Sequence, residues 1–290
     1  MKLSVYTLAC PEWTFEEAAA KIAGLGIPGV EWRVAPVAEK ITFDPRDGGR
    51  FWGANRATIP ADKVVEAARR VAKITADNGL TATFLAGGPQ PTELDAIRRQ
   101  MEAAQVLGAP AIRVGCGGSR TDDVNAAFDE ARRSWDEVEK LAARTGVKAV
   151  VETHHGTLVP TASAVRRFVE GRDPAHVGVL WDPGNMVWEG HERYELGLPL
   201  IRPWLAHVHV KNARPYLEGA DEMRRLRWSY RWCPLRNGLV DWPAAVAALR
   251  KVGYDGWLSL EDFNPETQAE EKLKDFADYF AGIIGTTDRS

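Results

Sequence analysis

Short runs of β-forming residues alternate with amphipathic stretches along the whole of this 290-residue chain. We expect eight strands, in the segments LSVYTLA, PGVEWRV, LTATFLAG, PAIRVGC, KAVVETH, VGVLWD, LAHVHVK and GWLSLED. A repeated strand–helix unit predicts a parallel sheet, and eight such units predict a closed (β/α)8 TIM barrel. A doubly wound open sheet is the alternative, but no GxGxxG turn follows the first strand. The sequence therefore predicts an α/β barrel that spans residues 1–290 as a single domain.

Helices are predicted between these strands by apolar periodicity and by end signals. The clearest patterns run from Ala61 to Asn78, from Glu93 to Leu107 and from Asp122 to Arg144. Three glycines stand where these helices would end in the left-handed conformation, namely Gly79, Gly108 and Gly146. Thr14 and Glu17 have the spacing of a capping box, which predicts a further helix beginning at this point.

Charge and cysteine content exclude several classes of function. The net charge of -3 and the pI near 6.1 provide no basic field for a nucleic acid backbone. No signal peptide or long apolar span is visible, so we expect a cytoplasmic protein with neither a nucleic acid nor a membrane partner. Cys10, Cys116 and Cys233 are odd in number and widely spaced, which argues against a disulfide framework and a cysteine zinc site.

Two connections are too long to be simple barrel loops. One runs from Ala35 to Ile59 after the second predicted strand, and the other from Asn212 to Leu239 after the seventh. Both are rich in aromatic residues and arginine, and long loops in a compact domain are usually functional or disordered. We expect each to form a lid over the barrel mouth. A contact between copies in a homo-oligomer is an equally good interpretation of the second loop, since Tyr, Trp and Arg favour interfaces.

Four acidic or imidazole side chains close apolar runs that we expect to be strands, namely Glu152, Asp182, His209 and Glu261. Side chains two residues apart share a face of a strand, and barrel active sites lie at the carboxyl ends of strands. Three carboxylates and one imidazole suit a single divalent ion that keeps open positions for water or substrate. We expect Mn²⁺, with Mg²⁺, Co²⁺ or Zn²⁺ as alternatives. Any one of these residues alone would be interpreted as a buried, hydrogen-bonded polar group.

Neighbours of these four residues are candidate substrate contacts. His154 lies one inward step beyond Glu152, where it would meet a substrate hydroxyl or bond to a nearby carboxylate. Lys211 follows His209 on the same face and would donate to a substrate oxygen or neutralise the carboxylates. His207 is two residues deeper, which favours a supporting or core role.

Three residues of other predicted strands are also candidates for substrate binding. Glu31 and Arg33 share a face of the second strand, so they predict a polar contact in the barrel mouth, with a plain internal ion pair as the alternative. Trp181 stands near the end of the sixth strand, where an aromatic face could stack on a sugar, although most tryptophans are packing residues.

Five segments together suggest a known family: VETHHGTLVPTASAV, VGVLWDPGNM, HVHVKNA, NGLVDWPAAVAAL and GYDGWLSLED. They resemble the xylose-isomerase-like TIM-barrel superfamily, which includes sugar isomerases and epimerases, inosose dehydratases and endonuclease IV. The resemblance covers most of the chain and is strongest from Val147 to Phe263. It implies that the four strand-end residues bind one metal ion and that Glu152 and Glu261 move the substrate proton. Many sugar epimerases have a histidine where this chain has Asn185, a candidate substrate contact.

These observations predict a metal-dependent sugar isomerase or epimerase that acts on a small carbohydrate. Proton abstraction next to a carbonyl would give an enediolate, and the carbon that is reprotonated decides the product. The alternative is a lyase or dehydratase acting on a keto-inositol or 3-keto-glycoside, in which a leaving group departs from the same intermediate. A phosphodiesterase like endonuclease IV is disfavoured by the six histidines and the negative net charge. A catalytically idle binding subunit is disfavoured because no ligand is missing.

Overall fold

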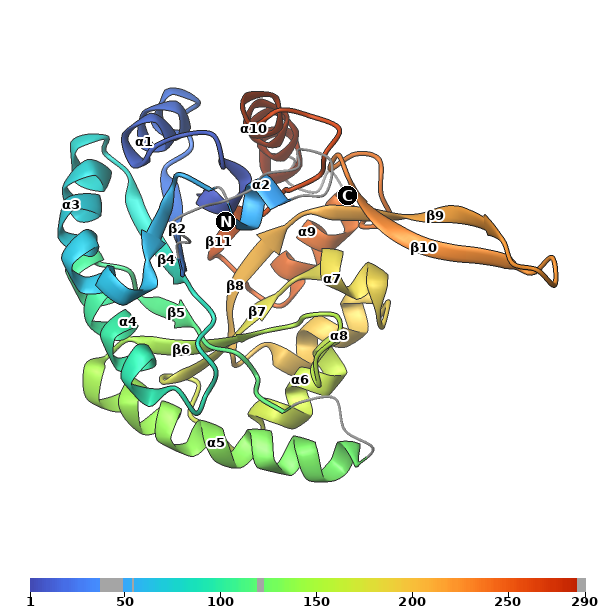
Figure 1. The fold of residues 1–290 in the computed structure, drawn as a ribbon, viewed down its shortest axis with the longest axis horizontal. Helices are drawn as coiled ribbons and strands as arrows, with labels where there is room; N and C mark the ends of the chain where they lie inside the picture. Colours follow the sequence, from blue (N-terminus) through green and yellow to red (C-terminus); the bar gives the residue numbers. More distant parts are fainter. Residues whose placement is uncertain (37–48, 54, 119–122, 286–290) are drawn as a thin grey trace.

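Eight parallel strands close into a barrel in the computed structural model, which describes residues 1–36, 49–53, 55–118 and 123–285 (Figure 1). The barrel strands are β1 (Lys2–Tyr6), β2 (Gly29–Ala35), β4 (Thr81–Ala86), β5 (Ala111–Arg113), β6 (Lys148–Glu152), β7 (Val177–Trp181), β8 (Leu205–Val210) and β11 (Trp257–Leu260). Neighbours in the chain pair in parallel, and β1 closes the barrel by pairing with both β11 and β2. The predicted barrel fold is confirmed, and each barrel strand overlaps one of the expected segments, with β1 and β2 each extending one residue beyond theirs.

Helices surround the barrel, as the sequence predicts (Figure 1). They are α1 (Phe15–Gly24), α2 (Gly49–Trp52), α3 (Val64–Asp77), α4 (Leu94–Leu107), α5 (Val124–Thr145), α6 (Ala162–Val169), α7 (Pro183–Trp188), α8 (Tyr194–Ile201), α9 (Trp242–Lys251) and α10 (Ala269–Gly285), with short 3-10 turns at Thr7–Ala9 and Ala61–Lys63. Thr14 and Glu17 form the expected capping box at the start of α1. Gly108 and Gly146 end α4 and α5 with φ of 72° and 70°. No helix in the described residues is long and apolar enough to span a membrane.

Alternation along the strands sorts side chains into two buried layers. A small inner cluster, including Tyr6, Phe84 and Leu180, fills the barrel itself. The larger outer cluster packs the strands against the helices and contains Trp32 and Trp181. Polar side chains that point inward from the strand ends collect at the carboxyl end of the barrel.

The first long connection contains a short strand and a short helix. β3 (Thr58–Pro60) pairs in parallel with β2 outside the barrel, and α2 lies near the mouth (Figure 1). Phe51 is buried in the inner cluster, and Trp52 is partly exposed. The lid predicted for this loop falls partly on residues 37–48 and 54, which lie outside the described residues.

The second long connection is a two-stranded antiparallel hairpin. β9 (Asn212–Ala220) and β10 (Leu226–Cys233) extend away from the barrel, with their turn farthest from it (Figure 1). Apolar side chains toward the tip are exposed, among them Met223 and Trp228 at 76% and 62%. Only the base, where Trp232 lies, reaches the barrel mouth. The hairpin as a whole is therefore not a lid, because paired strands hold its tip outward.

Candidate metal centre

The four predicted ligands meet at the carboxyl ends of β6, β7, β8 and β11. Each of Glu152, Asp182, His209 and Glu261 offers an atom within 4.8 Å of the others' atoms, and all four are buried. Nδ1 of His209 lies 3.1 Å from Glu261 Oε2, 3.4 Å from Glu152 Oε1 and 3.8 Å from Asp182 Oδ2. Three carboxylates therefore surround one ring nitrogen.

The orientation of His209 is fixed from its other nitrogen. Nε2 lies 3.0 Å from Oε1 of Glu31, and a carboxylate only accepts hydrogen bonds, so Nε2 carries the proton. Nδ1 is the nitrogen that faces the three carboxylates, and this buried atom has no hydrogen-bond partner among the described residues. One imidazole nitrogen and three carboxylates together form a suitable ligand set for a divalent ion, so these residues fit the predicted metal.

Glu31 supports the centre from below and does not face the cavity. Its carboxylate also accepts hydrogen bonds from His207 Nε2 at 2.9 Å and from Ser259 Oγ at 2.6 Å. Burial opposes ionisation of Glu31, but His209 and His207 outweigh burial and lower its pKa. The expectation that Glu31 contacts substrate in the mouth is wrong, because the residue lies mid-strand and is fully buried. His207 has the supporting position expected of it.

Arg33 is not paired with Glu31 either. Its guanidinium donates to Thr58 Oγ1 at 2.6 Å and to the Trp52 carbonyl at 2.7 Å. The predicted ion pair with Glu31 is therefore incorrect, whereas a contact between Arg33 and substrate stays a prediction. Arg33 instead lines a second cavity, next to the one at the metal centre.

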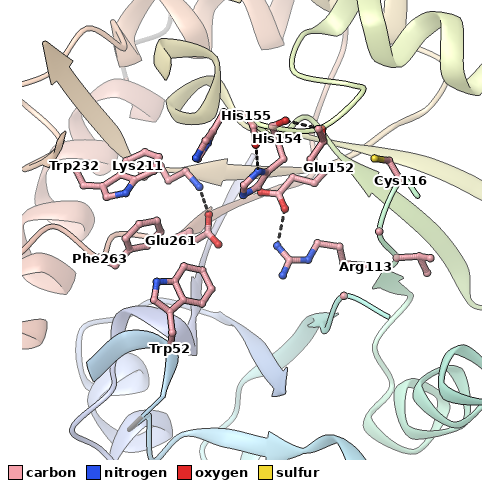
Figure 2. A pocket seen from close by; sticks show the side chains of 14 residues that line it. Trp52, Arg113, Cys116, Glu152, His154, His155, Lys211, Trp232, Glu261 and Phe263 are labelled. Atoms are coloured by element: carbon pink, nitrogen blue, oxygen red, sulfur yellow. Dashed lines mark hydrogen bonds and ion pairs between the residues drawn. The ribbon is translucent and has the colours of Figure 1, made fainter. Parts of the chain in front are cut away.

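A cavity of about 410 Å³ opens above the four ligands. Figure 2 shows Glu152 and Glu261 projecting into it from different sides, with aromatic side chains at the rim. Its lining also includes Trp52, Arg113, Cys116, His154, His155, Lys211, Trp232 and Phe263. A small polyhydroxy molecule has room here, with polar groups on the floor and rings around the entrance.

Lys211 is a cation at the floor of this cavity. Its Nζ lies 2.7 Å from Asp182 Oδ2 and bonds to Glu261, with the Trp232 ring 4.9 Å away (Figure 2). Burial favours its neutral form, but Asp182 and Glu261 outweigh burial and raise the pKa of Lys211. Lys211 therefore neutralises the carboxylates, one of the two roles expected of it. Burial also opposes ionisation of Glu261, and Lys211 with His209 lowers that pKa to about 2.

Arg113, at the end of β5, is a site residue that the sequence analysis missed. Its Nη1 donates to Glu152 Oε2 at 2.6 Å, and its Nε donates to the Gly87 carbonyl at 2.8 Å (Figure 2). Burial opposes ionisation of Glu152, but Arg113 holds the pKa of that carboxyl well below its usual range. The signal was available in the sequence, since Arg113 stands near the end of a predicted strand like the four ligands.

Asn185 holds two of the ligands in place. It lies in the first turn of α7, where Asp182 is the N-cap and accepts from the Asn185 amide at 3.0 Å. The Asn185 Nδ2 donates to Asp182 Oδ2 at 2.9 Å and to Glu152 Oε1 at 3.2 Å. Asn185 is fully buried and is not in the cavity lining, so the predicted substrate contact is incorrect.

Two consecutive histidines after β6 both line the cavity. Nδ1 of His154 donates to the His155 carbonyl at 2.7 Å, and Nδ1 of His155 lies 2.9 Å from Asn185 Oδ1. The His155 ring stacks on Trp188 with centroids 5.1 Å apart. His155 was not predicted, because alternation places consecutive residues on opposite faces. The rule does not apply here, since β6 ends at Glu152.

Trp181 is not a site residue. It is 1% exposed and packs edge-on against Tyr194 of α8, with centroids 5.5 Å apart. The alternation that points Leu180 and Asp182 inward points Trp181 outward, toward the helices. Trp52 and Trp232 line the cavity in its place.

Known proteins resemble this chain along nearly its whole length. The family model of the xylose isomerase-like TIM barrel matches residues 19–280. An inosose dehydratase from Geobacillus thermodenitrificans (strain NG80-2) is 25% identical over 272 residues, which cover 86% of this chain and 82% of that protein.

Solved structures agree in fold. The 3-keto-D-glucoside 4-epimerase from E. coli has a TM-score of 0.70 at 20% identity and covers 99% of this chain and 100% of its own. The IOLI protein with a bound zinc atom has a TM-score of 0.72 at 15% identity and covers 100% of both chains. The fold, together with the extent of the family match, establishes that this chain belongs to the xylose isomerase-like TIM barrel family.

Proposed function

We propose that this protein is a divalent-metal-dependent isomerase or epimerase of a sugar or related polyhydroxy ketone, acting by proton abstraction next to the carbonyl. The proposal rests on the position of His209 Nδ1, a buried atom that faces three carboxylates at the floor of a cavity and has no hydrogen-bond partner in the part of the chain that the structure describes. Mn²⁺ is the ion that we propose, although Mg²⁺, Co²⁺ and Zn²⁺ accept the same ligands.

The metal ligands and the residues that contact them would have separate roles in catalysis. The ion, when bound, polarises the carbonyl and stabilises the negative charge that develops on the substrate oxygens. Asp182 and His209 hold it and are themselves fixed by Asn185 and Glu31. Glu152 and Glu261 reach the cavity from different sides, so one removes a proton from one face of the substrate while the other returns it elsewhere.

Cations beside the two glutamates would keep both carboxylates ionised. Arg113 bonds to Glu152, and Lys211 bonds to Glu261. His154 lines the same cavity and would contact a substrate hydroxyl. Trp232 and Phe263 would cover the substrate and exclude water, since their rings contact each other at a centroid distance of 4.8 Å.

A dehydratase is the second candidate, and a specific observation favours it: the relative with 25% identity is an inosose dehydratase. Elimination shares the first step, because loss of a proton next to the carbonyl precedes departure of a hydroxyl group. It also needs an acid for the leaving hydroxyl, and the imidazole of His154 would serve.

Proton exchange in D₂O tests both candidates. The Mn²⁺-loaded protein would be incubated with ketoses, keto-inositols and 3-keto-glycosides and followed by NMR. An isomerase or epimerase gives a product of unchanged composition that carries deuterium, whereas a dehydratase gives a product that has lost water. If no substrate in the panel exchanges a C–H proton with a fully loaded protein, the proposed chemistry is wrong.

A further inference from the structure

A second cavity, of about 360 Å³, adjoins the one at the metal centre. Trp52, Gly88 and Arg113 line both cavities, so the two spaces share this part of their lining. The second cavity lies toward β1, β2 and β4, and the side chains of Tyr6 and Arg33 contribute to its wall. Neither the metal ligands nor the proposed proton transfers use this space.

Arg33 is a buried cation without an anionic partner in the part of the chain that the structure describes. The residue is 6% exposed, and its two hydrogen bonds go to a hydroxyl and to a backbone carbonyl, both uncharged. A guanidinium has five N–H donors, so donors remain for a ligand. Burial and the nearby Arg113 lower the pKa of Arg33 despite the opposing effect of Tyr6. Burying such a charge is costly unless an anion compensates it.

The other polar groups around this cavity do not supply that anion. Glu93 is exposed at its rim, and its carboxylate accepts from the Gln90 amide at 2.6 Å. Gln100 donates to the Leu85 carbonyl at 3.1 Å. Arg113 contributes a second guanidinium, which Glu152 already neutralises. Since Glu152 pairs with Arg113 and Glu93 is exposed at the rim, Arg33 is the buried charge that this cavity offers to an oxyanion among the described residues.

We propose that the second cavity binds a carboxylate or phosphate group of the substrate, with Arg33 as its principal partner. The substrate class is then an anionic polyhydroxy ketone, whose carbonyl end lies at the metal centre and whose charged end lies beside Arg33. This inference rests on the proposed function, since it assigns the rest of the substrate to the neighbouring cavity. Guanidinium geometry matches both oxyanions, so the choice between them belongs to experiment.

Matched ligands test the inference on the unmodified, Mn²⁺-loaded protein. Isothermal titration would compare D-fructose with D-fructose 6-phosphate and 5-keto-D-gluconate, and inorganic phosphate would be titrated separately. We expect at least one anionic sugar to bind about ten- to a hundredfold more tightly than D-fructose, the range for one charge-assisted hydrogen bond to a buried cation. Equal affinity for the neutral and the anionic sugars would overturn the proposal.

Two variants of Arg33 and a distant control variant test whether Arg33 causes the tighter binding of anionic sugars. Arg33→Gln should remove the preference for the anionic sugar, and Arg33→Lys should keep part of it. Arg202→Gln removes an exposed arginine at the opposite end of the barrel and should change nothing. Phosphate bound to the ion itself would persist in Arg33→Gln, so a preference that survives this substitution contradicts the proposal. If circular dichroism shows that Arg33→Gln does not fold, Arg33→Lys and the titrations of the wild-type protein with neutral and anionic sugars decide whether the proposal holds.

Three further outcomes separate the anion site, its assignment to the substrate and the proposed function. If inorganic phosphate binds through Arg33 but the sugar phosphate binds no more tightly than phosphate, the anion is a separate ligand, and the assignment to the substrate is wrong. If the anion preference holds but no sugar exchanges protons in D₂O, the proposed function fails while the anion site stands. If sugars exchange protons without any anion preference, the proposed function stands and the anion site is wrong.

Discussion

Glu31 decides which nitrogen of His209 is available to a metal ion. Its carboxylate accepts a hydrogen bond from Nε2 at 3.0 Å, so Nδ1 is the nitrogen that faces the other three ligands. Contacts of this kind fix the tautomer and raise the basicity of a metal-binding imidazole. The affinity of the centre therefore depends on a residue that does not touch the ion.

Substituting Glu31 by Gln should weaken Mn²⁺ binding about ten- to a hundredfold, because the neutral amide holds the Nε2 proton less strongly. The matched control is Ser259→Ala, which removes another hydrogen bond to the same carboxylate at 2.6 Å without touching His209. Isothermal titration with Mn²⁺ measures both. Equal affinities in Glu31→Gln and Ser259→Ala would show that orientation of His209 does not limit binding.

The glutamates are expected to differ from the other two ligands. Glu152→Gln and Glu261→Gln keep an oxygen ligand but cannot take up a proton, so they should retain some metal and lose turnover by roughly a thousandfold or more. Asp182→Ala and His209→Ala should instead weaken metal binding, and excess metal should restore part of their rate. If both Gln variants bind metal and exchange the substrate proton at near the parent rate, His154 or Lys211 becomes the base.

At the scale of the element, the β9–β10 hairpin has a base that lines the cavity and a tip that does not. Trp232→Ala removes a ring of the cavity wall and should raise KM about tenfold, since a buried aromatic contact is worth about 1.4 kcal/mol. Trp228→Ala is the matched control, because that ring lies on the same strand and is 62% exposed. Steady-state kinetics on both variants tests whether the base of the hairpin contributes to substrate binding and the tip does not. Equal effects at both positions would contradict it.

Helix α7 can approach the metal centre because its second residue is a glycine. A Cβ on Gly184 would lie 2.4 Å from Cγ of Lys211, a contact that must push one of the two away. Gly184→Ala should therefore displace Lys211, slow turnover and destabilise the fold by about 1–3 kcal/mol. Gly24→Ala, in α1, has nothing within 4 Å of its new Cβ and should leave activity unchanged. Denaturant unfolding and kinetics compare the two, and similar behaviour would count against the steric argument.

For the whole molecule, the sequence predicts the fold well because local signals repeat eight times. Strand alternation and strand ends also bring together the four candidate ligands, although their spacing in the chain exceeds a hundred residues between Glu152 and Glu261. Contacts between distant strands are harder to predict. Glu31 and His209 are 178 residues apart, and nothing local to Glu31 signals that its carboxylate lies below the centre.

The incorrect predictions have two physical causes. The prediction for Trp181 rests on its nearness to a strand end, although alternation turns the side chain toward Tyr194. Asn185 and the hairpin depend on how the chain continues after a strand: α7 begins directly after Asp182, and β9 begins at Asn212. A strand pattern carries no information about the direction of the segment that follows it.

Glu152, Asp182, His209 and Glu261 are proposed to hold one divalent ion. Titration of the chelator-treated protein with Mn²⁺, followed by electron paramagnetic resonance, tests it most directly. We predict about one bound ion per chain, by the logic of a single ligand set, with nitrogen hyperfine modulation from one imidazole that disappears in His209→Gln. No bound ion, or a bound ion whose nitrogen coupling survives in His209→Gln, would contradict this claim.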